Sequence, residues 1–144
     1  MINESLFSSN SDEWFTPQTF FDTVNQEFNF TLDVAATTSN TKCKKFFTIV
    51  DNGLEQDWSN EVVWCNPPYS DIKLWVEKAY NESLKGTKIV LLIPVRTDTR
   101  YFHSFIYGKA ELRFIKGRLK FECEDKTKKL NSAPFPSMIV IYNL

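Results

Sequence analysis

The stretch from residue 61 to residue 94 constrains the fold of this chain more than any other. Its first apolar segment, EVVWC (61–65), is followed after one residue by two prolines, which lack the backbone N–H that a sheet ladder requires. Apolar side chains then recur at helical spacing over residues 72–80, and KIVLLIP (88–94) follows as an unbroken apolar run, typical of a strand buried on both faces. The order strand, helix, strand predicts two parallel strands joined by a crossover helix.

The segments on either side of this stretch extend the pattern. Thr16 and Pro17 fit the N-cap and first position of an amphipathic helix, and Ser70 fits the N-cap of the second helix. Further strand candidates are FTLDVAAT (30–37), KKFFTIV (44–50), AELRFI (110–115), RLKFEC (118–123) and SMIVIY (137–142). The pair Lys116-Gly117 could close a hairpin between two of them. We therefore predict an α/β fold with an open sheet that is mostly parallel and has an antiparallel C-terminal edge.

The length of 144 residues fits one domain with a core of its own. We expect a single domain over residues 1–144, with the polar residues 1–12 flexible. No apolar run approaches the ~20 residues that span a membrane, and the N-terminus does not resemble a signal segment, which predicts a cytoplasmic protein with no membrane partner. Three widely spaced cysteines without a CxxC pair indicate neither a disulfide framework nor a metal site.

The charge is distributed unevenly along the chain. The net charge is −1, but residues 67–144 carry 14 basic and 8 acidic side chains, against 3 and 10 in residues 1–66. Residues 109–129 hold 8 basic and 4 acidic side chains with aromatic residues among them. Such a segment is expected where a protein contacts phosphates, although a solvated strand face has the same composition.

The tetrapeptide Asn66-Pro67-Pro68-Tyr69 follows a predicted parallel strand, at the kind of edge where open α/β sheets bind ligands. The side-chain carbonyl of Asn66 and the backbone carbonyl of Pro67 could accept both N–H groups of an exocyclic amine, as in adenine. They would stabilise the tetrahedral nitrogen of a methyl-transfer transition state. Pro68 would stiffen the loop, and Tyr69 would stack on a base that is flipped out or single-stranded. An ordinary Asn-Pro turn is the alternative, but the strand before it and the helix after it favour a functional site.

The ordered set of motifs in this chain resembles the small phage-type DNA N6-adenine methyltransferases, the phage Dam family. The motifs are DEWFTP, FTLDVAAT, KCKKFFT, DNGLEQDW, VWCNPPYS, LLIPVRTDTRYF, GRLKF and APFPSMIVIY, spread over residues 12–142. The resemblance implies a Rossmann-like methyltransferase fold and transfer of a methyl group from S-adenosylmethionine to N6 of adenine in DNA. Phage or prophage origin, and hence the cytoplasm of a host cell, follows from the same resemblance.

The resemblance also assigns roles to particular residues. The catalytic residues would be Asn66, Pro67, Pro68 and Tyr69. The cofactor-binding residues would be Phe15, Thr16, Pro17, Asp33, Ala35 and Asp51, with Asp57 as a weaker alternative to Asp51. Arg118, Lys120 and Phe121, within the motif GRLKF, would face the DNA, and an exposed hairpin with alternating residues is the alternative. Arg96, after the strand candidate at 88–94, could line the same cleft.

The chain also departs from the family pattern. The segment LDVAATTSNTKC (32–43) has no glycine, although cofactor loops are usually glycine-rich so that backbone can approach the ligand. We therefore expect an abbreviated cofactor half, in which Asn40 is a candidate for the ribose, and no separate target-recognition domain. Two alternatives stay open at this point: a protein glutamine methyltransferase, which can share the tetrapeptide, and a non-catalytic nucleic-acid-binding relic. The sequence also leaves open a homodimer and the identity of the target site.

Overall fold

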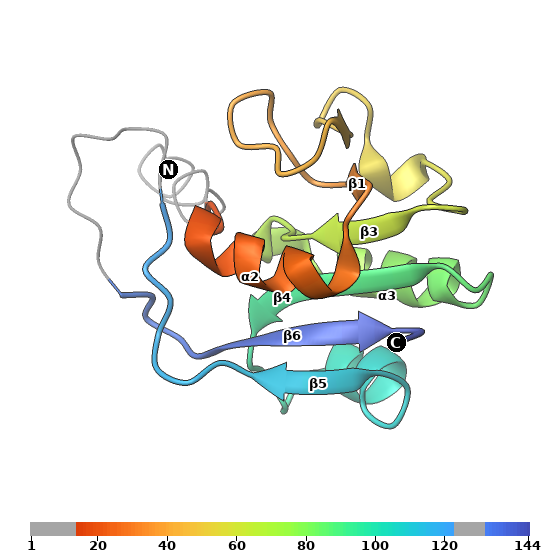
Figure 1. The fold of residues 1–144 in the computed structure, drawn as a ribbon. Coiled ribbons are helices and arrows are strands. Elements are labelled where there is room, and N and C mark those ends of the chain that lie inside the picture. The colour runs from red at the N-terminus through yellow and green to blue at the C-terminus, as the bar shows by residue number, and fades with distance from the viewer. Residues whose placement is uncertain (1–13, 123–131) are drawn as a thin grey trace, which may run out of the picture.

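Six strands form one sheet in the order β2-β1-β3-β4-β6-β5 (Figure 1). In this computed structural model, which describes residues 14–122 and 132–144, the strands are β1 (Leu32–Asp33), β2 (Lys45–Phe46), β3 (Val62–Cys65), β4 (Lys88–Pro94), β5 (Glu111–Phe114) and β6 (Ser137–Tyr142). The helices are α2 (Gln18–Phe28) and α3 (Ile72–Ser83), with short helical turns at Gly53–Glu55, Tyr69–Asp71 and Phe102–Ile106. β2, β1, β3 and β4 pair in parallel, whereas β6 pairs antiparallel with β4 and with β5. The predicted α/β sheet with its antiparallel C-terminal edge is confirmed.

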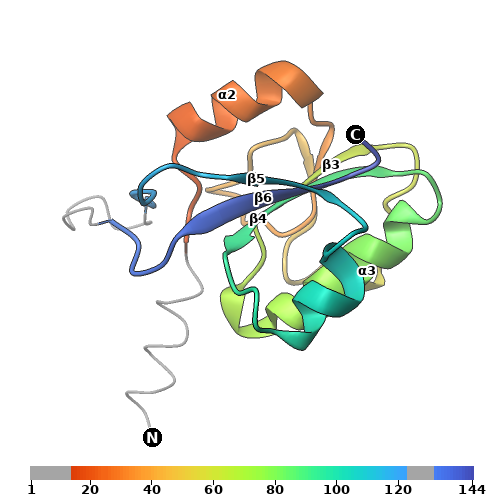
Figure 2. The same cartoon turned by 90° about the horizontal axis from the view of Figure 1, so that it is seen from below.

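The two helices cover opposite faces of the sheet (Figure 2). α2 turns Phe21, Val24 and Phe28 inward, where they join a core that includes Val90 and Leu92 of β4. The alternate residues of β4 belong to the second core, on the face that α3 covers. Because both faces of β4 are covered, its unbroken apolar sequence is explained.

The starts of both helices differ from the sequence-based prediction. Pro17 takes the N-cap position of α2 without a side-chain cap, so Thr16 is not the N-cap. The Thr16 hydroxyl instead accepts a hydrogen bond from the side chain of Asn66. A turn precedes α3, and as a result Asp71, not Ser70, takes its N-cap position.

The predicted hairpin between residues 110–115 and 118–123 does not form. β5 pairs with β6, which is buried along its whole length and offers a long edge for pairing. The second segment turns away, and Phe121 packs into an aromatic cluster with Trp14. Its one isolated bridge within the described residues joins Glu122 to Phe15.

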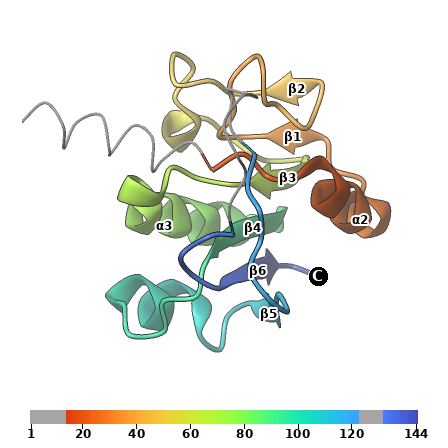
Figure 3. The ribbon, with the colours of Figure 1, turned by 90° about the vertical axis from the view of Figure 1, so that its left-hand side faces the viewer.

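The carboxyl ends of β1, β3 and β4 lie along the same edge of the sheet, which faces the viewer in Figure 3. The chain leaves these strands at Val34, Asn66 and Val95. Three loops distant in sequence therefore meet at this edge, and the tetrapeptide lies in the central one.

Residues 1–12, which we predict to be flexible, lie outside the described part of the chain. Over residues 14–122 and 132–144, no helix combines the length and the apolar character needed to cross a membrane.

Candidate active site

The side chain of Asn66 is held at one end only. Its amide nitrogen Nδ2 donates to the backbone carbonyl of Trp14 and, at 3.0 Å, to the hydroxyl of Thr16. Its carbonyl oxygen Oδ1 is buried and has no hydrogen-bond partner among the described residues. A buried acceptor without a partner costs about 1–3 kcal/mol, which makes this oxygen a candidate to accept a hydrogen bond from a ligand.

The two prolines fix the direction of the loop that follows Asn66. Pro67 is buried and Pro68 has a φ of −59° and a ψ of 128°. The carbonyl of Pro68 accepts the backbone N–H of Asp71 at 3.1 Å, which closes the turn leading into α3. The loop therefore leaves β3 with little conformational freedom.

Tyr69 stands in a group of aromatic side chains drawn from distant parts of the chain. Its ring stacks on Trp14 with centroids 6.2 Å apart and planes 16° apart, and packs edge-on against Phe135 at 5.5 Å and Phe121 at 6.4 Å. Its hydroxyl is buried without a hydrogen-bond partner among the described residues. Burial raises the pKa of the Tyr69 hydroxyl well above its ordinary value, so the hydroxyl stays neutral.

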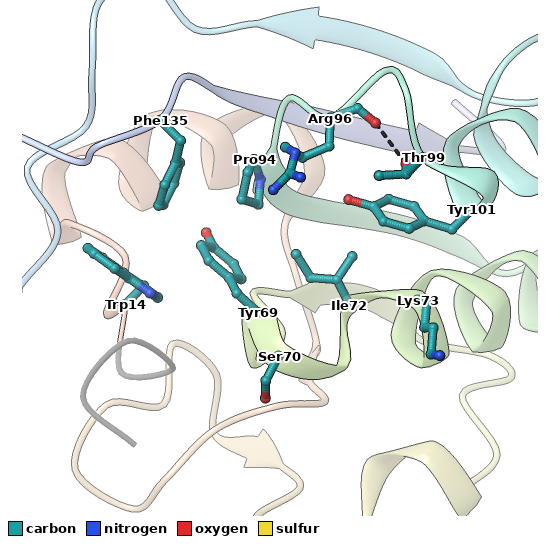
Figure 4. A pocket seen from close by; sticks show the side chains of 10 residues that line it. All are labelled: Trp14, Tyr69, Ser70, Ile72, Lys73, Pro94, Arg96, Thr99, Tyr101 and Phe135. Carbon is teal, nitrogen blue, oxygen red and sulfur yellow. Dashed lines mark hydrogen bonds between the residues drawn. The ribbon is translucent and has the colours of Figure 1, made fainter. Parts of the chain in front are cut away.

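A cavity of about 520 Å³, the aromatic cavity, opens beside Tyr69 (Figure 4). Its lining includes Trp14, Tyr69, Ile72, Pro94, Tyr101 and Phe135. Two cations, Lys73 and Arg96, also border it. Flat aromatic walls with cations at the margin suit a planar base attached to a phosphate backbone.

A second cavity of about 550 Å³, the Asp33 cavity, lies across the tetrapeptide from the first. The Asp33 carboxylate at the end of β1 is 3% exposed and accepts the backbone N–H groups of Lys42 at 3.0 Å and Ala35 at 3.3 Å. Burial outweighs these hydrogen bonds and raises the pKa of Asp33 to about 6. Among the described residues, no lysine or arginine side chain forms an ion pair with Asp33. A buried acidic group therefore lines the cavity.

The rest of this lining combines small, aromatic and polar side chains. Phe15, Thr16, Ala35 and Asn40 line the cavity, which brings four residues singled out in the sequence to one place. Gly53 also lines it, and a Cβ atom there would approach the carbonyl oxygen of Val34 to 2.2 Å. The close backbone approach is therefore made by a glycine outside residues 32–43, which the sequence analysis names only within the motif DNGLEQDW.

Three of the acidic and proline positions considered for the cofactor lie elsewhere. Asp51 is exposed, and its carboxylate accepts the backbone N–H of Thr48 at 2.8 Å, so it shapes the loop beside the Asp33 cavity without lining it. Pro17 does not line the cavity either. Asp57 is exposed and does not line the cavity, and hydrogen bonds from Ser59 hold the pKa of its carboxyl well below its ordinary value.

The residues expected to face DNA are split between surface and interior. Arg118 and Lys120 are exposed and border neither cavity, and Arg118 donates to the carbonyl of Ala133 at 3.3 Å. Phe121 is 5% exposed and belongs to the aromatic group around Tyr69. Two cations that the sequence analysis did not single out line the cavities: Lys73, one helical turn beyond the tetrapeptide, borders the aromatic cavity, and Lys42 borders the Asp33 cavity.

The two cavities meet at the tetrapeptide. Asn66 and Pro68 line the Asp33 cavity, Tyr69 lines the aromatic cavity, and Trp14 lines both. Within the described residues there is no cluster of three or more His, Cys, Asp or Glu side chains placed to hold a metal ion. The two cavities therefore adjoin, and Asn66, whose Oδ1 has no partner among the described residues, lies in the wall of the Asp33 cavity.

An open, mostly parallel α/β sheet with this antiparallel C-terminal edge is the fold of a Rossmann-like methyltransferase. Residues 4–144 match the family described as DNA N-6-adenine-methyltransferase (Dam), and the chain belongs to that family. A DNA N-6-adenine-methyltransferase of Haemophilus phage HP1 is 32% identical over 146 residues, covering 99% of this chain and 84% of the phage protein. A second, from Escherichia phage T1, is 32% identical over 110 residues, which cover 75% of this chain and 46% of that protein.

Proposed function

We propose that this protein transfers a methyl group from S-adenosylmethionine to the exocyclic N6 of adenine in DNA. Membership of the family supports the reaction class. The observation that carries the finer assignment is the buried Oδ1 of Asn66, which has no partner among the described residues while Nδ2 is bonded twice. An acceptor fixed in this way stabilises a donor amine without reorganising.

The aromatic cavity is the proposed site of the target base. Tyr69 provides the stacking surface, and a base–aromatic stack is worth about 1–3 kcal/mol. A base within a duplex cannot reach this cavity unless it is flipped out, at a cost of a few kcal/mol. Lys73 and Arg96 at the margin are placed to hold the flanking phosphates.

The Asp33 cavity is the proposed site of the methyl donor. Its volume of about 550 Å³ lies in the range of small-molecule sites, about 300–1,000 Å³. The buried carboxylate of Asp33 would accept from the ammonium, ribose or adenine donors of the cofactor, and Phe15, Thr16 and Ala35 would line its surroundings. Asp51 would contribute by ordering the loop at Thr48. Bound S-adenosylmethionine supplies an electrophilic methyl group on a positively charged sulfur.

The protein's part in the reaction is to orient and polarise the amine. The adenine amine is a poor nucleophile because its lone pair is delocalised into the ring. Asn66 Oδ1 and the carbonyl of Pro67 would accept its two N–H bonds and favour a tetrahedral nitrogen, which is the geometry of the transition state. The buried loop excludes water that would compete for these acceptors. After transfer, the amine releases its extra proton to solvent, and no covalent intermediate with the protein is required.

The direct test uses purified protein, methyl-tritiated S-adenosylmethionine and unmethylated DNA, followed by nucleoside analysis. N6-methyladenine from the wild-type protein, and none from Asn66→Ala, is the expected result. Transfer of the label to an added protein substrate, but not to DNA, would instead indicate a glutamine methyltransferase. DNA binding without cofactor binding would indicate a non-catalytic relic.

A further inference from the structure

Residues 14–16, the strap, run across the tetrapeptide and contact both of its ends. The Trp14 carbonyl and the Thr16 hydroxyl accept from Asn66, and the Trp14 ring stacks on Tyr69. Phe15, between them, exchanges two backbone hydrogen bonds with Glu122, at 3.2 and 2.9 Å. The strap is thereby anchored on one side and holds the tetrapeptide on the other.

The strap determines which end of the Asn66 amide is bonded within the protein and which end is left without a partner among the described residues. A backbone carbonyl can only accept a hydrogen bond, so the group that faces the Trp14 carbonyl has to be the NH₂ of the amide. The second hydrogen of that NH₂ is taken by the Thr16 hydroxyl. Rotating the amide by half a turn would set Oδ1 against the Trp14 carbonyl oxygen, and the Thr16 hydroxyl would have to turn from accepting to donating.

The orientation matters because the two ends of the amide have opposite chemistry. When Oδ1 is the end left without a partner, the side chain can accept a hydrogen bond from an incoming amine. If Nδ2 were that end, two hydrogen-bond donors would face each other. Thr16 is 2% exposed, so water does not readily replace its hydroxyl as the second acceptor. Thr16 lies 50 residues before Asn66 in the sequence and on the side of the Asp33 cavity.

We propose that Thr16 is a positioning residue that, together with the carbonyl of Trp14, locks the amide of Asn66 with Oδ1 toward the methyl acceptor. This inference rests on the proposed function, since it concerns how Asn66 is prepared for the amine. It assigns to Thr16 a role toward the acceptor amine in addition to lining the proposed donor site. The hydroxyl acts through Asn66 and does not itself touch the reacting atoms.

The test compares Thr16→Val, which keeps the shape and removes the acceptor, with Thr16→Ser, which restores the hydroxyl. Thr23→Val is the matched control, because Thr23 is exposed on α2 and its hydroxyl bonds only locally to the carbonyl of Thr19. Thr16→Val should lower kcat about tenfold, as expected for one hydrogen bond that orients a catalytic group. The KM for DNA and the affinity for S-adenosylhomocysteine, measured by calorimetry, should change less than about twofold. Thr16→Ser should recover most of kcat.

A second readout does not depend on turnover. The ¹⁵N side-chain signal of Asn66, assigned by its absence in Asn66→Ala, should show slowly exchanging Nδ2 protons in the wild type and faster exchange in Thr16→Val. Thr16→Ala provides the same comparison should the valine variant fail to fold, because it also lacks the hydroxyl.

Three outcomes would overturn the inference: an unchanged kcat in Thr16→Val, a loss of S-adenosylhomocysteine binding that accounts for the whole defect, or no recovery in Thr16→Ser. Failure of the proposed function is a different result, in which the wild-type protein itself does not methylate DNA. In that case, the rate of proton exchange at Asn66 Nδ2 would still test whether Thr16 holds the amide.

Discussion

The amino edge of the sheet, where the parallel strands begin, and its carboxyl edge, where they end, differ in whether their buried polar groups have hydrogen-bond partners. α3 runs back from the carboxyl end of β3 to the amino end of β4, so its last turn lies at the amino edge. There the Glu82 carboxylate is 3% exposed and accepts from the backbone N–H of Trp58 at 2.6 Å, from Lys85 at 2.7 Å and from Lys78 at 3.2 Å. Asn143, at the same edge, donates to two backbone carbonyls. The polar groups of this edge are satisfied within the protein.

At the carboxyl edge, by contrast, some buried polar atoms have no partner among the described residues. Among the described residues, the buried side-chain atoms that lack a hydrogen bond are Asn66 Oδ1, the Tyr69 hydroxyl and Ser137 Oγ. Asn66 and Tyr69 follow β3, and Ser137 pairs in register with Pro94, the last residue of β4. All three therefore lie at the edge that binds ligands in open α/β sheets.

The difference separates what stabilises the fold from what serves the site. Satisfied groups at the amino edge contribute to the free energy of unfolding, whereas unpartnered groups at the carboxyl edge reduce it and are available to a ligand. Substitutions at the two edges should consequently move different quantities: stability at one and catalysis or binding at the other.

The largest effect is expected for Asn66→Ala. Loss of the acceptor should lower kcat by at least about 100-fold, in line with the removal of one preorganised transition-state contact. The free energy of unfolding should change by less than about 1 kcal/mol, because two lost hydrogen bonds are offset by removal of an unpartnered buried oxygen. Methylation kinetics and urea unfolding measure the two quantities. Asn81→Ala, an exposed position on α3, is the control, and a large loss of stability without loss of kcat would reverse the assignment of Asn66.

Asp33 should make the ligand-free protein less stable as the pH rises. Its pKa is about 6 in the folded protein against an ordinary 3.8, so the folded state binds the proton more tightly than the unfolded state. The contribution is full below pH 3.8 and is lost as the pH rises through 6, with a span of about 3 kcal/mol. Urea unfolding of the wild type and Asp33→Asn between pH 4 and pH 7.5 measures it. An equal slope in both proteins would show that Asp33 is not its source.

Glu82→Gln should change the free energy of unfolding but not catalysis. The contribution of Glu82 to stability depends on pH in the opposite sense to that of Asp33. Burial by itself would raise the pKa of Glu82, but hydrogen bonds from Lys85, Trp58 and Lys78 outweigh it and lower the pKa below its ordinary 4.5. The stabilisation is thus present above that value and lost as the pH falls through the folded pKa. The substitution should cost about 2 kcal/mol at pH 7, within the range for hydrogen bonds to a charged group, and leave kcat per folded molecule unchanged. Glu77→Gln, exposed on the same helix, is the control for urea unfolding.

The smallest effect concerns the cations around the aromatic cavity. Arg96→Gln should weaken binding of DNA more than Arg118→Gln, since Arg96 borders the cavity and Arg118 does not. Loss of one phosphate contact should reduce the slope of log affinity against log salt by about 1. Fluorescence anisotropy over a range of salt concentrations measures this slope. A larger change for Arg118→Gln would indicate that the DNA binds along residues 118–120 instead.

Some parts of this molecule could be predicted because their signals are local. The strand β3, the helix α3 and the strand β4 follow from proline placement and hydrophobic period, which depend only on neighbours in the sequence. The position of the tetrapeptide at the carboxyl end of a parallel strand follows from the same pattern. The partner of β5 could not be predicted this way, because pairing with β6 depends on which edge is buried in the folded sheet.

The sequence by itself determined the class of fold and the residue that carries the proposed chemistry, since both are recorded in short contiguous motifs. Only the tertiary structure decided what surrounds that residue. In the folded protein Thr16 does not cap the helix but accepts a hydrogen bond from Asn66. Asp51 lies outside the Asp33 cavity, whereas Gly53 lines it. These outcomes depend on hydrogen bonds and close approaches between segments far apart in the chain, and no local propensity specifies them.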